Sequence, residues 1–171
     1  MLSSPFAVRP AHGGPPPIYA TAVTLTRSEV IHRAATIWPL GHVPYSQGAV
    51  HDPGWRTDCS GYVSMCLGLA PPGLSTVTLV TEGHLHEITR DELRPGDLVG
   101  RCGPGTAGDA GHVVLFDRWD SEPITYWAYE FHGGPENGPQ HSLIRYPYHD
   151  LDGYQAYRFS QITDGRGCSG A

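Results

Sequence analysis

The fold is decided by the stretch Thr57-Asp58-Cys59-Ser60-Gly61-Tyr62-Val63-Ser64-Met65-Cys66-Leu67, in which a polar turn passes into an apolar helix. Asp58 is a good N-cap, because its carboxylate can accept a hydrogen bond from an unpaired backbone N–H of the first helical turn. Cys59 then lies at the positive end of the helix, where the thiolate is favoured. Apolar residues recur at the spacing of a buried helix face, namely Cys59, Tyr62, Val63, Cys66, Leu67 and Ala70.

The local sequence leaves two interpretations of Cys59 open. A cysteine at a helix start can be a reactive nucleophile, because the thiolate is the attacking species. An unpaired cysteine can equally be a small buried hydrophobic residue. Partners elsewhere in the chain must decide between these interpretations.

The composition limits the classes of protein. A chain of 171 residues is long enough for one domain with its own core. The net charge of −6 and the pI near 5.9 argue against nucleic acid or an anionic membrane as partner, since both favour a basic surface. The sequence has no run of about 18 apolar residues, so we expect no membrane span.

The chain is expected to form a single domain over residues 21–162, between a flexible Pro/Gly-rich leader at 1–20 and a frayed tail at 163–171. The leader lacks the charged start and apolar core of a secretory signal. As it stands the chain is expected to be cytoplasmic, or extracellular if a signal was removed before residue 1. We expect a monomer.

The four cysteines do not suggest a disulfide scaffold or a metal site, because no C-x-x-C spacing occurs. Cys59 and Cys66 on one helix would lie about 10 Å apart along its axis, beyond the reach of a disulfide. Cys102 and Cys168 could pair, although nothing in the sequence requires it. We expect neither a metal ion nor a cofactor.

Patterns along the chain predict both helices and strands. Thr26 and Glu29 have capping-box spacing at the start of a helix that ends before Pro39. One helical turn is expected at 89–93. Short strands or extended segments are expected at 77–80, 85–88, 98–100, 112–116, 124–131, 143–146 and 154–159.

Polar residues on two of these strands could complete a site around Cys59. His112 opens an apolar, β-branched strand, and Glu130 lies among aromatic residues on the returning strand. A nucleophilic cysteine needs a histidine base, and that histidine needs an acceptor on its second ring nitrogen. Glu130 is the expected acceptor, and His132, on the same strand face, is the alternative.

These motifs together resemble those of the NlpC/P60 cysteine peptidases, a papain-like superfamily of cell-wall amidases that includes CHAP domains. The matching segments occur in family order, and they are Val43-Pro44-Tyr45, Asp58-Cys59-Ser60-Gly61-Tyr62-Val63, Leu93-Arg94-Pro95-Gly96-Asp97-Leu98-Val99 and Gly111-His112-Val113-Val114-Leu115-Phe116.

The resemblance implies an α+β fold, in which the helix carrying the nucleophile packs on an antiparallel sheet of about five to six strands. It implies cleavage of amide bonds in peptidoglycan stem peptides, or in a related small peptide, through a thioacyl-enzyme. By position, Cys59 is the nucleophile and His112 the base and then the acid. Tyr45 matches the family's site tyrosine, and Asp58 and Ser60 are expected beside it on the substrate and oxyanion side.

The family's third residue is commonly His, Asn or Gln and lies closer to the catalytic histidine than Glu130 or His132 does here. The loop between Cys102 and Gly111 is also longer than the family pattern leads us to expect. An alternative function uses the same Cys-His pair in an intracellular acyltransferase or thioesterase acting on a small metabolite. A non-catalytic binding domain is a further alternative, against which the intact Cys59 and His112 count.

Overall fold

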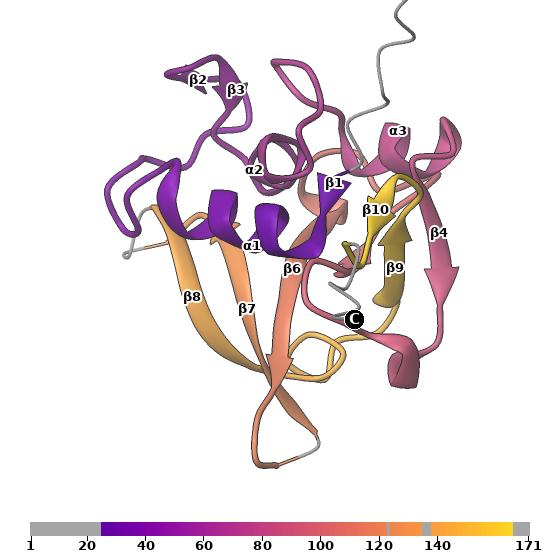
Figure 1. The fold of residues 1–171 in the computed structure, drawn as a ribbon. Coiled ribbons are helices and arrows are strands. Elements are labelled where there is room, and N and C mark those ends of the chain that lie inside the picture. Colours follow the sequence, from indigo (N-terminus) through magenta and orange to yellow (C-terminus); the bar gives the residue numbers. More distant parts are fainter. Residues whose placement is uncertain (1–24, 123, 135–137, 166–171) are drawn as a thin grey trace, which may run out of the picture.

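A six-stranded antiparallel sheet forms the centre of the molecule (Figure 1). The computed structural model describes residues 25–122, 124–134 and 138–165. The strand order is β4-β9-β5-β6-β7-β8. The strands are β4 (Leu85–Ile88), β5 (Leu98–Arg101), β6 (His112–Trp119), β7 (Thr125–His132), β8 (Gly138–Arg145) and β9 (Gln155–Phe159).

Two helices, α1 (Arg27–Thr36) and α2 (Cys59–Cys66), pack against each other, and α2 contacts β6 and β7 (Figure 1). The predicted capping box at the start of α1 is present, because Thr26 accepts a hydrogen bond from the Glu29 backbone and the Glu29 carboxylate accepts one from the Thr26 backbone. The expected α+β fold, with the cysteine helix on an antiparallel sheet of five to six strands, is therefore confirmed.

Shorter elements complete the fold. They are α3 (Thr76–Thr81), the 3₁₀ turns η1 (Arg90–Glu92) and η2 (Gly108–Ala110), the antiparallel pair β2 (Val50–His51) and β3 (Trp55–Arg56), and the parallel pair β1 (Leu25–Thr26) and β10 (Ile162–Thr163). The β1–β10 pair carries the folded chain past residue 162, where we expected the tail to begin.

Alternation along the central strands builds a core on each face of the sheet. Val113 and Leu115 of β6 belong to the cluster that includes α1 and α2. Val114 and Phe116 point to the opposite face, where they pack with residues such as Tyr126. The sheet is thus buried on both faces, which fixes the position of the start of β6 relative to α2.

The prediction of a strand at 77–80 is wrong, because these residues lie in α3. Ser75 accepts a hydrogen bond of 3.1 Å from the Thr78 backbone N–H, and the Thr78 hydroxyl accepts one of 2.7 Å from the Ser75 N–H. This reciprocal cap satisfies helix-end donors, and Leu79 is fully buried. The cap and the burial outweigh the strand preference of the β-branched residues.

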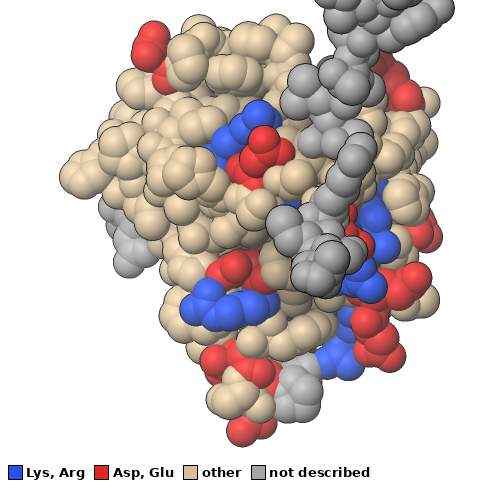
Figure 2. Space-filling model, viewed as in Figure 1, with Lys and Arg blue, Asp and Glu red and all other residues tan. Residues whose placement is uncertain are grey.

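The Pro-Gly-Asp motif serves the fold, because Asp97 is completely buried in a network of arginines. Its carboxylate accepts hydrogen bonds from Arg27 at 2.9 Å and from Arg158 at 2.8 and 3.0 Å. Asp164, beyond the end of β10, extends this network by ion pairs with Arg27 and Arg94. On the face drawn in Figure 2, most basic side chains accordingly lie directly beside acidic ones.

Among the helices of the described ranges, none has both the length and the apolar character that crossing a membrane requires.

Candidate active site

Cys59 is the first residue of α2, as the sequence predicts. Asp58 is the N-cap, and its Oδ1 accepts a hydrogen bond of 2.6 Å from the Gly61 backbone N–H. Backbone N–H groups of Val113, Ser60 and Cys59 itself hydrogen-bond the Cys59 sulfur. The thiol is therefore held between the start of its own helix and the start of β6.

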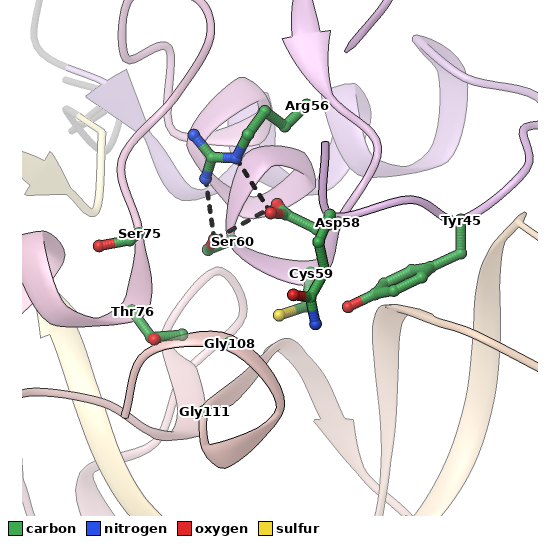
Figure 3. A pocket seen from close by; sticks show the side chains of 10 residues that line it. Tyr45, Arg56, Asp58, Cys59, Ser60, Ser75, Thr76, Gly108 and Gly111 are labelled. Carbon is green, nitrogen blue, oxygen red and sulfur yellow. Dashed lines mark hydrogen bonds and ion pairs between the residues drawn. The ribbon is translucent and has the colours of Figure 1, made fainter. Parts of the chain in front are cut away.

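Arg56 clamps the turn that precedes the nucleophile (Figure 3). Its Nε donates to Asp58 Oδ2 at 3.0 Å, and its Nη2 donates to Ser60 Oγ at 3.1 Å. Its remaining donors reach backbone carbonyls of the 72–74 turn, at 3.4 Å for Pro72, 2.8 Å for Gly73 and 3.0 Å for Leu74. A guanidinium has five donors, and here they are all engaged in holding the turn.

Gly61 is required by the same turn. A Cβ atom at this position would lie 2.3 Å from the Arg56 carbonyl oxygen. The absence of a side chain therefore lets the backbone of residue 56 pass directly over the first turn of α2.

A pocket with a volume of about 170 Å³ opens in front of the thiol (Figure 3). The side chains predicted on the substrate side, Tyr45, Asp58 and Ser60, all line it together with Cys59. Its full lining is Tyr45, Gln47, Arg56, Asp58, Cys59, Ser60, Ser75, Thr76, Gly108 and Gly111. The structure therefore brings together all the predicted site residues that come from the first half of the chain.

Tyr45 extends its hydroxyl toward Cys59 (Figure 3). Its ring packs edge-on against Phe131 of β7 at a centroid distance of 5.4 Å, so Tyr45 contributes to the core as well as to the pocket. Burial and the nearby Cys59 raise the pKa of Tyr45 to about 12. The phenol is therefore protonated at neutral pH and can donate a hydrogen bond into the pocket.

Two loops meet at the pocket rim. Gln47 Nε2 donates a hydrogen bond of 2.6 Å to Asp109 Oδ1 in η2. Gly108 and Gly111 of the long loop between Cys102 and Gly111 line the pocket, so this loop forms one of its walls.

His112 begins β6 and lies directly opposite Arg101 of β5. The next residue, Val113, supplies the backbone N–H that reaches the Cys59 sulfur. The structure therefore places the start of β6, next to His112, beside the Cys59 sulfur. The Nε2 atom of His112 is buried and has no hydrogen-bond partner among the described residues.

Burial makes both members of the pair electrically neutral. It raises the pKa of Cys59 to about 11; the neighbouring Asp58 carboxylate also raises this pKa, whereas the backbone N–H groups lower it. Burial, followed by the charges of His132 and His149, lowers the pKa of His112 to about 4. Desolvation of the buried sulfur therefore opposes the preference for the thiolate that the helix N-terminus provides.

Glu130 lies on β7 and is only 3% exposed. Its Oε2 accepts a hydrogen bond of 2.9 Å from the Tyr148 hydroxyl, and its Oε1 lies 3.8 Å from His132 Nε2. The structure does not form the predicted hydrogen bond from His112 Nε2 to this carboxylate. His132, the alternative third residue, is close enough to influence the charge of His112.

Sequence reasoning missed Arg56, Gln47 and Tyr148. The sequence offers one signal for Arg56, which is its position two residues before the N-cap Asp58. Gln47 and Tyr148 reach the site from irregular segments, where no periodicity marks a side chain's direction.

Within the described residues, His, Cys, Asp and Glu side chains do not gather in any group of three that could hold a metal ion. Among the described residues, Cys59, Cys66 and Cys102 form no disulfide. Cys168 lies outside the described residues, so the structure does not test whether it pairs with Cys102.

Five solved chains are similar to this one, and two of them follow. RipB from Mycobacterium tuberculosis, described as a peptidoglycan hydrolase, has 21% identity and a TM-score of 0.50, with 77% of this chain and 63% of that chain covered. The chain has the NlpC/P60 fold. A lipoprotein-like protein of the NLP/P60 family from Staphylococcus aureus has 23% identity and a TM-score of 0.45, with 75% and 40% covered. No protein-family model and no curated protein matches the sequence.

The NlpC/P60 fold explains why motifs scattered over the sequence meet in one place. The helix start at Cys59 and the strand start at His112 lie together because α2 packs on β6. The chain spans less than two thirds of either solved chain, so the similarity is one of this domain.

Proposed function

We propose that the protein is a cysteine hydrolase that cleaves amide bonds through a thioacyl intermediate on Cys59. The observation that carries this proposal is the position of the Cys59 sulfur, at a helix start, on the floor of a pocket and hydrogen-bonded by the residue that follows His112. A purely structural cysteine has no need of a pocket or of an adjacent histidine.

The first step is proton transfer within a neutral pair. Because His112 has a lowered pKa, its imidazole is neutral at pH 7 and can accept the thiol proton as the sulfur attacks the substrate carbonyl. The new bond is carbon–sulfur, and the carbonyl π electrons move to oxygen. The imidazolium then donates its proton to the leaving amine as the carbon–nitrogen bond breaks.

The developing oxyanion requires hydrogen-bond donors. The backbone N–H of Cys59 lies at the positive end of α2, and the protonated hydroxyl of Tyr45 points toward the same atom (Figure 3). Such preorganised donors are worth the most in a site with little water. Water then attacks the thioester, with His112 as base, and the carboxylic acid leaves while the thiol is restored.

Glu130 and His132 are the two candidates for the third residue of the site. The Glu130 carboxylate accepts its hydrogen bond from Tyr148, so His132 is the remaining candidate for the residue that orients His112. His132→Ala is then expected to reduce kcat more than KM, since an orienting residue acts on the transition state.

Peptidoglycan stem peptides are the substrate class that we propose. The fold shared with RipB, a peptidoglycan hydrolase, supports this class. The polar lining of the pocket by Ser60, Ser75 and Thr76 also suits a peptide, whose amide groups need hydrogen-bond partners. None of the comparisons supports the alternative of an intracellular amide-forming enzyme.

The test is hydrolysis of purified stem-peptide fragments containing D-glutamyl and diaminopimelyl residues, followed by released amine and by mass spectrometry. Cys59→Ala should reduce the rate by at least about 1,000-fold, because it removes the nucleophile. Cys66→Ala, seven positions along the same helix and away from the pocket, should retain activity. Unchanged hydrolysis by Cys59→Ala would refute the mechanism, and an amide product formed with an added amine would favour acyl transfer.

A further inference from the structure

The ring of Tyr148 lies directly on the imidazole of His112. The two ring centroids are 4.8 Å apart, and the planes are tilted by 55°. Tyr148 comes from the segment between β8 and β9, more than thirty residues along the chain from the strand that it covers. The Nε2 atom of the same imidazole is buried and has no hydrogen-bond partner within the part of the chain that the structure describes.

Glu130 holds Tyr148 in this position. The carboxylate is 3% exposed and accepts a hydrogen bond of 2.9 Å from the Tyr148 hydroxyl. A buried carboxylate is costly unless it is paired, so the tyrosine hydroxyl and the carboxylate constrain each other. Glu130 is thus linked to His112 indirectly, through the ring of Tyr148.

The backbone that presents Tyr148 is constrained as well. His149 and Asp150, which follow it, both have positive φ, at 51° and 61°. The His149 N–H donates to the Arg145 carbonyl at 2.8 Å, and the Asp150 carboxylate accepts a hydrogen bond of 2.8 Å from Arg145 Nε. Consecutive left-handed residues outside glycine persist only where surrounding contacts enforce them, and they cluster at functional sites.

The other face of Tyr148 is covered in turn. Tyr154 stacks on it at 4.9 Å with an interplanar angle of 18°, and the Arg101 guanidinium lies 5.1 Å from the Tyr154 ring. Arg101 is the residue directly opposite His112 in the β5–β6 pairing. The column His112, Tyr148, Tyr154 and Arg101 therefore starts and ends on paired positions of the sheet.

We propose that Tyr148, anchored by Glu130, is a positioning residue that fixes the imidazole of His112 and keeps water from its Nε2 atom. The proposal rests on the proposed function, since it presumes that His112 is the base. It assigns Glu130 an indirect role in place of the direct contact expected from the sequence.

The charged and titratable groups around His112 come from several elements. His132 lies on β7, His149 adjoins Tyr148, and Arg101 belongs to β5. Tyr148 itself, whose pKa is raised by burial and by Glu130, stays protonated and so continues to donate to the carboxylate. A change in the His112 titration after mutation of Tyr148 would therefore report the loss of shielding.

The experiment compares Tyr148→Phe, Tyr148→Leu, Glu130→Gln and the Tyr148→Phe/Glu130→Gln double variant. Tyr146→Phe is the matched control, because Tyr146 lies in the same segment but packs on Trp119 and Tyr126. Tyr148→Phe should lower kcat about 10-fold with little change in KM, and Tyr148→Leu about 100-fold, since displacement of a catalytic group by an ångström is costly. The control should remain near the unmodified rate.

The double variant separates the two roles of Glu130. If the carboxylate acts through Tyr148, the double variant should be no slower than the slower single variant, because both changes break one contact. If Glu130 orients His112 directly, Glu130→Gln alone should be slow while Tyr148→Phe is unaffected, and that result would overturn the proposal.

A second readout does not depend on turnover. In the intact protein, the NMR titration of the His112 ring should have its midpoint well below pH 6.5 and should move upward in Tyr148→Phe and Tyr148→Leu but not in Tyr146→Phe. An unchanged His112 titration in both Tyr148 variants would overturn the proposal even if Cys59→Ala is inactive. An active Cys59→Ala would instead refute the proposed function, so the two failures are distinguishable.

Discussion

Arg56 donates a hydrogen bond of 3.0 Å to Asp58, the residue that caps the nucleophile helix. The two carboxylate oxygens of Asp58 have different donors. Oδ2 accepts the hydrogen bond from Arg56, and Oδ1 accepts one from the backbone N–H of Gly61. The negative charge next to Cys59 is thereby compensated, and the helix start is joined to the 72–74 turn that Arg56 also holds. Arg56 therefore helps to fix the turn from which Cys59 projects.

Arg56→Lys should therefore lower kcat/KM, by about 10-fold, although it keeps the positive charge. An ammonium group is a point charge and cannot replace the planar fork that reaches Asp58, Ser60 and three backbone carbonyls at once. Steady-state kinetics on the stem-peptide substrate measure the effect. Arg118→Lys, at an exposed position on β6, is the control, and equal losses in both variants would contradict this role for Arg56.

Asp97→Asn should destabilise the protein by about 3 kcal/mol, because it leaves two partly buried arginines without their shared counter-charge. Urea unfolding followed by circular dichroism gives the free energy of unfolding. Asp164→Asn, at the exposed edge of the same network, should change it little. A neutral effect of Asp97→Asn would show that the Pro-Gly-Asp motif does not serve the fold.

The lowered pKa of His112 determines the pH dependence of activity. The imidazole must be neutral to accept the thiol proton, so kcat/KM should rise with pH to a plateau, with a midpoint well below 6.5 and near pH 4. Because the Cys59 thiol has a pKa of about 11, no second limb is expected between pH 6 and about pH 9. A bell-shaped profile centred near neutral pH would instead indicate a resting thiolate–imidazolium pair.

The same shift has a consequence for stability. Between about pH 4 and pH 6.5 the unfolded chain binds a proton on His112 that the folded protein does not, so the free energy of unfolding should fall as the pH is lowered through this range. His112→Asn should show a weaker fall over that interval. Thermal unfolding at several pH values checks both statements.

The parts of the fold that the sequence predicts well are those with local signals. The N-caps Thr26 and Asp58 each mark the start of a helix correctly, and the apolar run after His112 marks β6. The segment 77–80 misleads because its β-branched residues favour a strand, whereas the reciprocal Ser75–Thr78 cap stabilises α3.

The candidate site also has one part that local motifs predict and another part that they do not. Cys59, Asp58 and Ser60 are neighbours in sequence, and Tyr45 shares their pocket, so local motifs identify that side of the site. The contacts of His112 could not be predicted, because Tyr148 reaches it from an irregular segment and takes the hydrogen bond of Glu130. Long-range packing of this kind leaves no periodic signal in the sequence.

Covalent attack by Cys59 is tested most directly by acid-quenching the protein during turnover of a stem-peptide fragment and measuring the mass of the peptide that trypsin releases between Arg56 and Arg90. Fragmentation of that peptide distinguishes Cys59 from Cys66. We expect an added mass equal to the acyl part of the substrate, located on Cys59, and no such adduct in Cys59→Ala. Continued hydrolysis by Cys59→Ala, or an adduct located on another residue, would contradict the account.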